Sequence, residues 1–141
     1  MLESFTLFPE PGALVAGANP FTVVCVSTDA ADGTWVQASG ELDLAGAPEL
    51  SSALRGAARA SGLVALDLSE LGFIDCSGVH AIVDCSVQQR SEGRRLLLAG
   101  CSERVRRIFA LTGTGTEVEF VELCEAEALI GTLPTSQSVA A

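Results

Sequence analysis

The feature that most constrains the fold is a short segment, residues 63–68, that is apolar almost without interruption. It reads Leu-Val-Ala-Leu-Asp-Leu, whereas a strand with one face in water alternates between apolar and polar residues. A second apolar segment of this kind occupies residues 96–99. Strands of this composition are typical of a sheet that is covered on both faces, so the sequence predicts an α/β protein.

Amphipathic segments with helical spacing separate these strands. Apolar residues recur at i, i+3, i+4 and i+7 before Gly62, at Leu50, Ala53, Leu54 and Ala57. The same reasoning predicts helices that begin after Asp75, after Ser102 and near residue 126, and further strands at 21–28, 34–39 and 118–121. The order ββαβαβαβα predicts an N-terminal β-hairpin and then right-handed crossovers. The expected fold is a mixed sheet of four to five strands with helices packed mainly on one face.

The chain divides into three parts. Residues 1–20 hold three prolines and show no regular period, so we expect an N-terminal extension there. Residues 21–133 form the single domain. Residues 134–141 are small and polar, which predicts a flexible tail.

Composition excludes several classes of function. The chain has 18 acidic residues against eight arginines and no lysine, a formal charge of −10, so it repels phosphate backbones and we expect no direct nucleic-acid partner. Basic protein surfaces would attract it. No apolar run reaches the length of a membrane span, and Glu3 stands where a signal peptide carries a base. We therefore expect a cytoplasmic protein with no membrane partner.

The cysteines and the histidine indicate neither a disulfide framework nor a metal site. The five cysteines are odd in number and form no C-x-x-C pair, and they lie at Cys25, Cys76, Cys85, Cys101 and Cys124. Such thiols are typical of a reducing compartment. His80 is the sole histidine and has no second ligand at metal spacing, so we expect no metal and no cofactor.

The candidate functional site is the segment that follows the strand at 63–68. Ligands and modifications collect where parallel strands end and helices begin. Residues 69–75, predicted as a linker, end in an acid that precedes Cys76, Ser77 and Gly78. Unpaired backbone N–H groups and the helix dipole favour a phosphate or a thiolate at such a helix start. We expect residues 75–78 to be exposed.

At this point the sequence resembles the STAS domain family, in particular the bacterial anti-sigma factor antagonists. Residues 40–43, Gly-Glu-Leu-Asp, are similar to the family's G-E-[LI]-D segment. Residues 66–69 and 73–79, Leu-Asp-Leu-Ser and Phe-Ile-Asp-Cys-Ser-Gly-Val, resemble its D-L-S and F-[IM]-D-S-[ST]-G elements. Residues 104–113 are similar to its third-helix motif, and the resemblance spans residues 21–133.

The resemblance implies a switch between binding partners. An antagonist of this family binds an anti-sigma factor with an ATP-binding kinase fold and so frees a sigma factor, until phosphorylation of a serine breaks the complex. It acts on no small-molecule substrate. The implied partner-binding residues are Asp43, Asp75, Cys76, Ser77 and Gly78. For the two acids, the simpler interpretation is a turn or cap role.

One position departs from the family pattern, because Cys76 stands where the phosphorylated serine usually follows the aspartate. Either Ser77 is the phosphorylation site, or the switch uses other chemistry. Cys101 also follows a strand that we expect to be parallel, so Cys76 and Cys101 are candidates for a redox switch. The alternative is that Cys76 and Cys101 are two unpaired, unreactive thiols, which fits the sequence equally well.

Two rival functions share features with this sequence. A cysteine at a strand-to-helix turn is typical of some enzymes, but a phosphatase loop needs arginine where Ile82 stands. A hydrolase elbow needs glycine where Ile74 stands, so we expect no enzyme activity. The second rival is a STAS regulatory subunit of a transporter or of a larger signalling assembly, for which the sequence offers no distinguishing motif.

Overall fold

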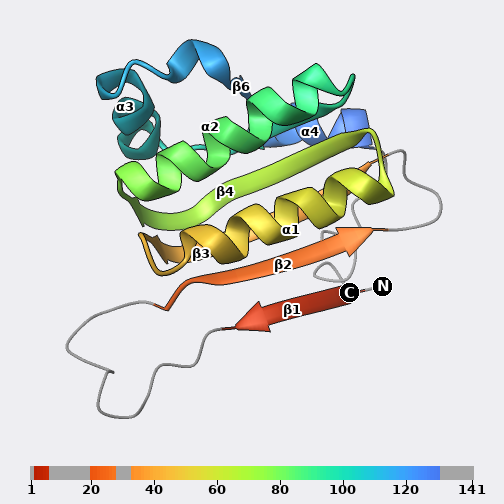
Figure 1. The fold of residues 1–141 in the computed structure, drawn as a ribbon, viewed down its shortest axis with the longest axis horizontal. Coiled ribbons are helices and arrows are strands. Elements are labelled where there is room, and N and C mark those ends of the chain that lie inside the picture. The colour runs from red at the N-terminus through yellow and green to blue at the C-terminus, as the bar shows by residue number, and fades with distance from the viewer. Residues whose placement is uncertain (1, 7–19, 28–32, 131–141) are drawn as a thin grey trace.

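The computed structural model describes residues 2–6, 20–27 and 33–130 (Figure 1). The predicted tail at 134–141 lies outside these described residues. The elements in chain order are β1 (Leu2–Thr6), β2 (Thr22–Ser27), β3 (Thr34–Leu42), α1 (Ala47–Ala60), β4 (Leu63–Ile74), α2 (Cys76–Ser91), β5 (Arg95–Ala99), α3 (Glu103–Leu111), the 3₁₀ turn η2 (Gly115–Glu117), β6 (Glu119–Val121) and α4 (Leu123–Ile130).

The strands form one mixed sheet in the order β1-β2-β3-β4-β5-β6. β2 and β3 are antiparallel and form the predicted N-terminal hairpin, whereas β3, β4, β5 and β6 run parallel to one another. The additional strand is β1, which pairs antiparallel with β2 inside the segment predicted to be an extension. A strand of five residues near three prolines is too short to show a regular alternation in the sequence. Its strand structure depends on pairing with β2, which the local sequence does not reveal.

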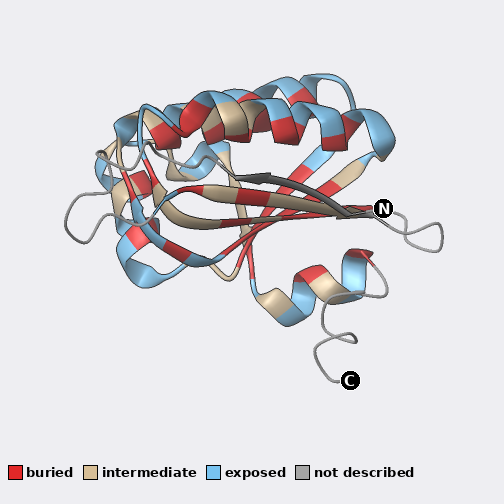
Figure 2. Cartoon of the chain, turned by 90° about the horizontal axis from the view of Figure 1, so that it is seen from below, coloured by how far each residue is buried: buried red, intermediate tan, exposed pale blue. Residues whose placement is uncertain are grey.

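Both faces of the sheet are covered by helices, which explains why β4 and β5 are apolar along almost their whole length. α1, α2 and α3 lie on one face and α4 lies on the other (Figure 2). In β4, Val64 and Leu66 join the larger core beneath α1, α2 and α3, whereas Ala65 between them joins a smaller core with Ala126 and Ile130 of α4. The prediction of strands buried on both faces, with helices mainly on one, is confirmed.

β4 is longer than the sequence indicated. Residues 69–74, predicted as part of a linker, continue the strand and pair with β3 from Ser39↔Glu70 to Leu42↔Ile74. Two register shifts interrupt this pairing, so β4 holds more residues than the stretch of β3 beside it. A linker was the wrong interpretation because such bulges break the regular alternation that identifies a strand.

A buried carboxylate stabilises the middle of β4. Asp67 is only 6% exposed. One of its oxygens, Oδ1, accepts hydrogen bonds from the Ser69 N–H at 2.9 Å and from the Ser69 hydroxyl at 2.6 Å. The Asp-Leu-Ser motif therefore has a structural role here, because a buried carboxylate needs such donors.

The close packing of α2 on the ends of β3 and β4 makes a testable prediction at Gly78. A Cβ added there would lie 2.7 Å from Leu42 Cγ and 2.8 Å from Ile74 Cγ1, both in buried side chains. We expect Gly78→Ala to lower the free energy of unfolding by about 1–3 kcal/mol, as overpacked cores do. Urea denaturation followed by circular dichroism measures the change.

Gly56, in the middle of α1, provides the matched control. A Cβ there would meet no atom within 4 Å, so Gly56→Ala should raise the free energy of unfolding by about 0.5–1 kcal/mol through helix propensity alone. Equal stabilisation by both substitutions would contradict the described packing of α2.

Candidate functional site

The pairing of β3 with β4 brings two loops together at one end of the sheet. Leu42 and Ile74 are partners at the end of the two strands, and the Asp75 N–H donates to the Leu42 carbonyl at 3.1 Å. Asp43 and Asp75 therefore follow directly after paired residues. The loop before α1 and the start of α2 form one surface, which we call the strand-end surface and define by Asp43, Leu44, Phe73, Asp75, Cys76 and Ser77.

Both acids have local structural roles. Asp75 is the N-cap of α2, and its Oδ1 accepts from the Gly78 N–H at 3.1 Å. The exposed Asp43 accepts from the Ala45 N–H at 3.0 Å, and its carbonyl accepts from the N–H groups of Gly46 and Ala47 at 3.1 Å and 3.0 Å. The turn and cap interpretation is therefore confirmed for both residues. A partner-binding role of the same residues stays a prediction.

The three residues that follow Asp75 differ in exposure. Cys76 is exposed and Ser77 is half-buried at the first two positions of α2. Gly78 is buried against Leu42 and Ile74, so the expectation that it would be exposed is wrong. Gly78 supports the surface from beneath, because the absence of a side chain lets α2 approach the ends of the strands.

Two large apolar side chains on this surface were missed by the sequence analysis. Leu44 is 73% exposed in the loop before α1, and Phe73 is 47% exposed near the end of β4, one residue before the Ile74 that pairs with Leu42. Exposed apolar side chains that gather at one place with a polar rim are typical of protein-binding sites, and these two lie at the same end of the sheet. Phe73 does stand in the family motif, but its exposure depends on the bulged register of β4.

The structure keeps Cys76 and Cys101 as separate thiols. Both are free cysteines, and β5 ends at Ala99 opposite Asp67, whereas β4 continues to Ile74 before Cys76 begins α2. β4 therefore extends past the end of its parallel neighbour β5, and a disulfide between Cys76 and Cys101 under oxidising conditions stays a prediction. Cys101 is half-buried, and burial raises the pKa of its thiol to about 11, against a smaller opposing effect of the Arg106 charge.

The described residues hold no cluster of metal ligands and no helix suited to a membrane. Within residues 2–6, 20–27 and 33–130, no three or more His, Cys, Asp or Glu side chains gather in an arrangement that would hold a metal ion. His80 is exposed on α2. In that part of the chain, no helix combines the length and the apolar character needed to cross a bilayer.

Thiol labelling tests this arrangement. With iodoacetamide at pH 8, we expect Cys76 to be alkylated well before Cys101, because Cys76 is exposed and the high pKa of Cys101 keeps it protonated. The thiolate fraction of Cys101 grows as the pH approaches its pKa, so its rate should still rise between pH 9 and about 11. Mass spectrometry of the alkylated peptides gives both rates.

Cys76→Ser serves as the control, since it removes the exposed Cys76 thiol and should leave the labelling of Cys101 unchanged. Circular dichroism at each pH confirms that the fold is retained. If an oxidant protected Cys76 and Cys101 together in the wild type, the separation of the two thiols described above would be wrong.

Comparison with known proteins identifies the family. The model of the STAS domain matches residues 26–128. The anti-sigma-B factor antagonist of Listeria monocytogenes is 32% identical over 82 residues, which make up 57% of this chain and 72% of the relative. The corresponding protein of Listeria innocua matches to the same extent.

Solved structures share the fold at lower identity. The anti-sigma factor antagonist SpoIIAA in its unphosphorylated form matches with a TM-score of 0.58 at 22% identity, over 71% of this chain and 89% of that one. An anti-sigma factor antagonist from Mycobacterium paratuberculosis matches with 0.59 at 20% identity, over 84% and 92%. A sulfate transporter family protein from Wolinella succinogenes matches with 0.56 at 23% identity, over 67% and 80%. The chain belongs to the STAS domain family and is a distant homologue of the anti-sigma factor antagonists.

Proposed function

We propose that this protein is an anti-sigma factor antagonist that binds an anti-sigma factor with an ATP-binding kinase fold and so releases a sigma factor. The observation that carries the proposal is the strand-end surface, where Leu44 and Phe73 are exposed at the same end of the sheet as the half-buried Ser77. The similarity to antagonists of Listeria supports it. The protein acts in this proposal as a binding partner in the cytoplasm and not as an enzyme.

The chemistry of the surface fits a protein partner. Leu44 and Phe73 supply apolar area that a partner can remove from water, and such anchors carry most of the energy of an interface. Asp43 and Asp75 lie on the same surface and would be attracted to basic groups on the partner. Charge steers the encounter, and the apolar contacts hold the complex.

Phosphorylation of Ser77 would reverse this binding. Ser77 is the second residue of α2, where the N–H groups and the dipole of the helix accommodate an added phosphate. The phosphate would bring a charge of about −1.5 to −2 into a surface that already holds Asp43 and Asp75. A partner surface that fits a neutral serine and two carboxylates would be repelled.

Oxidation of Cys76 is the alternative switch. Its thiol is exposed at the first position of α2, on the same surface as Ser77. An oxidised sulfur there would change the size and polarity of the contact. This form of the switch needs no bond to Cys101.

A regulatory subunit of a transporter is the second candidate function. The observation in its favour is the structural similarity to the sulfate transporter family protein of Wolinella succinogenes. Affinity purification of the tagged chain from its source cell separates the candidates. Recovery of a small ATP-binding kinase supports the antagonist, and recovery of a membrane transport subunit supports the alternative.

The affinity for the purified anti-sigma factor tests the surface directly. We expect Leu44→Ser to weaken binding about tenfold or more, because a large side chain that is 73% exposed loses its apolar contact with the partner. Leu111→Ser is the matched control, since Leu111 is 74% exposed but lies at the end of α3. Isothermal titration calorimetry gives both affinities, and equal losses would place the interface elsewhere.

The phosphorylation site is tested with the cognate kinase and ATP. Mass spectrometry should locate the phosphate on Ser77, and Ser77→Ala should abolish it. Ser77→Glu should weaken the complex through repulsion in the contact, whereas Ser77→Ala should still bind. Cys76→Ser should create a second phosphorylation site, and modification of a distant serine alone would argue against this switch.

A further inference from the structure

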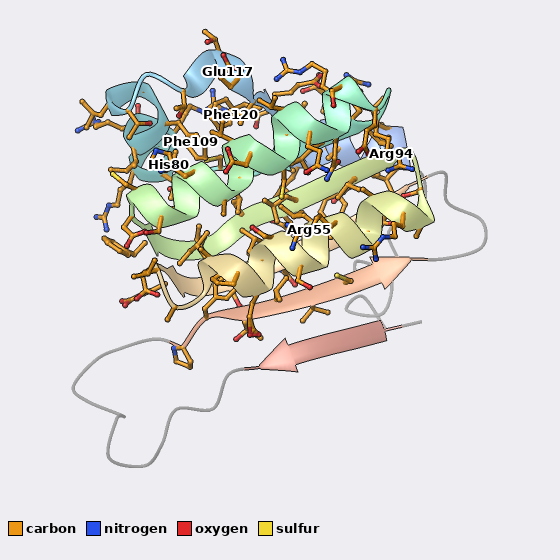
Figure 3. The ribbon with its side chains drawn as sticks, in the orientation of Figure 1. Arg55, His80, Arg94, Phe109, Glu117 and Phe120 are labelled. Carbon is orange, nitrogen blue, oxygen red and sulfur yellow. The ribbon has the colours of Figure 1, made fainter. Side chains whose placement is uncertain are left out.

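A polar cavity lies between α1 and α2, near the end of α2 that is far from Cys76. Its volume is about 230 Å³, and its lining includes Arg55 and Arg59 of α1 and Arg94 just beyond α2. Figure 3 shows Arg55 on α1 and Arg94 in the segment that follows α2. Gln89 is 13 residues after Cys76 on α2, so the cavity is about 20 Å along the helix from the strand-end surface.

The charge of the cavity is opposite to that of the whole chain. The protein carries a formal charge of −10 and only eight arginines, yet three of these line this one cavity. Glu92 also lines it and pairs with Arg94 at 3.0 Å. Three positive groups and one negative group leave an excess of positive charge, which favours an anion with more than one negative charge.

We propose that this cavity binds a small anion that carries at least two negative charges. The three arginines that line it hold the charged oxygens. The volume is below the roughly 300–1,000 Å³ that is typical for drug-sized ligands, which limits the ligand to the size of a small polycarboxylate or a tetrahedral oxyanion. Because the site lies away from the strand-end surface, it is independent of the proposed partner binding.

Calorimetry with paired probes at constant ionic strength tests the proposal on the full chain. Citrate and sulfate carry at least two negative charges at neutral pH, whereas acetate and chloride carry one. We expect saturable binding of citrate or of sulfate with one site per chain, and at least tenfold weaker binding of acetate and of chloride. The stronger of the first two probes shows whether the site prefers carboxylate oxygens or a tetrahedral oxyanion.

Variants locate the binding in the cavity. Arg55→Gln and Arg94→Gln should each weaken it about tenfold, whereas Arg104→Gln, with the same change of charge on the exposed face of α3, should have no effect. Arg55 is exposed, so its substitution should leave the fold intact, and thermal unfolding checks that each variant folds.

Two results would overturn the proposal. The first is the absence of saturable binding for all four probes. The second is an equal loss of affinity in Arg104→Gln and Arg55→Gln, since this would show only a general response of an acidic protein to anions.

Discussion

The long parallel pairing of β3 with β4 is the interaction on which the rest of the structure depends. It joins the antiparallel part of the sheet to the parallel part, and it ends with Leu42 opposite Ile74. The hydrogen bond from the Asp75 N–H to the Leu42 carbonyl then sets the start of α2 against the loop before α1. Two segments that are separate in sequence thereby become one surface.

The strand-end surface contains residues that stabilise the fold and side chains that are exposed to solvent. The Asp75 carboxylate caps α2, and the glycine at position 78 lets the helix rest on Leu42 and Ile74. These local requirements use the backbone and the inner side of the turn, so the outward side chains remain available for a partner. The same residues can therefore hold the fold together and, in the proposed function, present Cys76 and Ser77 to a kinase.

The distribution of charge separates two regions along α2. Its N-terminal end lies between acidic residues of the strand-end surface, whereas arginines from α1 and from the segment after α2 surround its C-terminal end. A helix with acidic surroundings at its start and basic surroundings at its end also agrees with its own dipole. The two ends of α2 thus differ in charge, which is why the proposed partner site and the proposed anion site are distinct.

The sequence by itself determined the α/β class, the two-sided burial of β4 and β5, the N-cap at Asp75 and the family, because these follow from residues that are close neighbours in the chain. Only the tertiary structure decided the pairing of β1, the extension of β4, the burial of Gly78 and the exposure of Leu44. The physical reason is that a helix cap or an apolar period depends only on residues that are close together in the chain. The end of a strand, a glycine contact and an exposed side chain instead depend on partners far away in sequence.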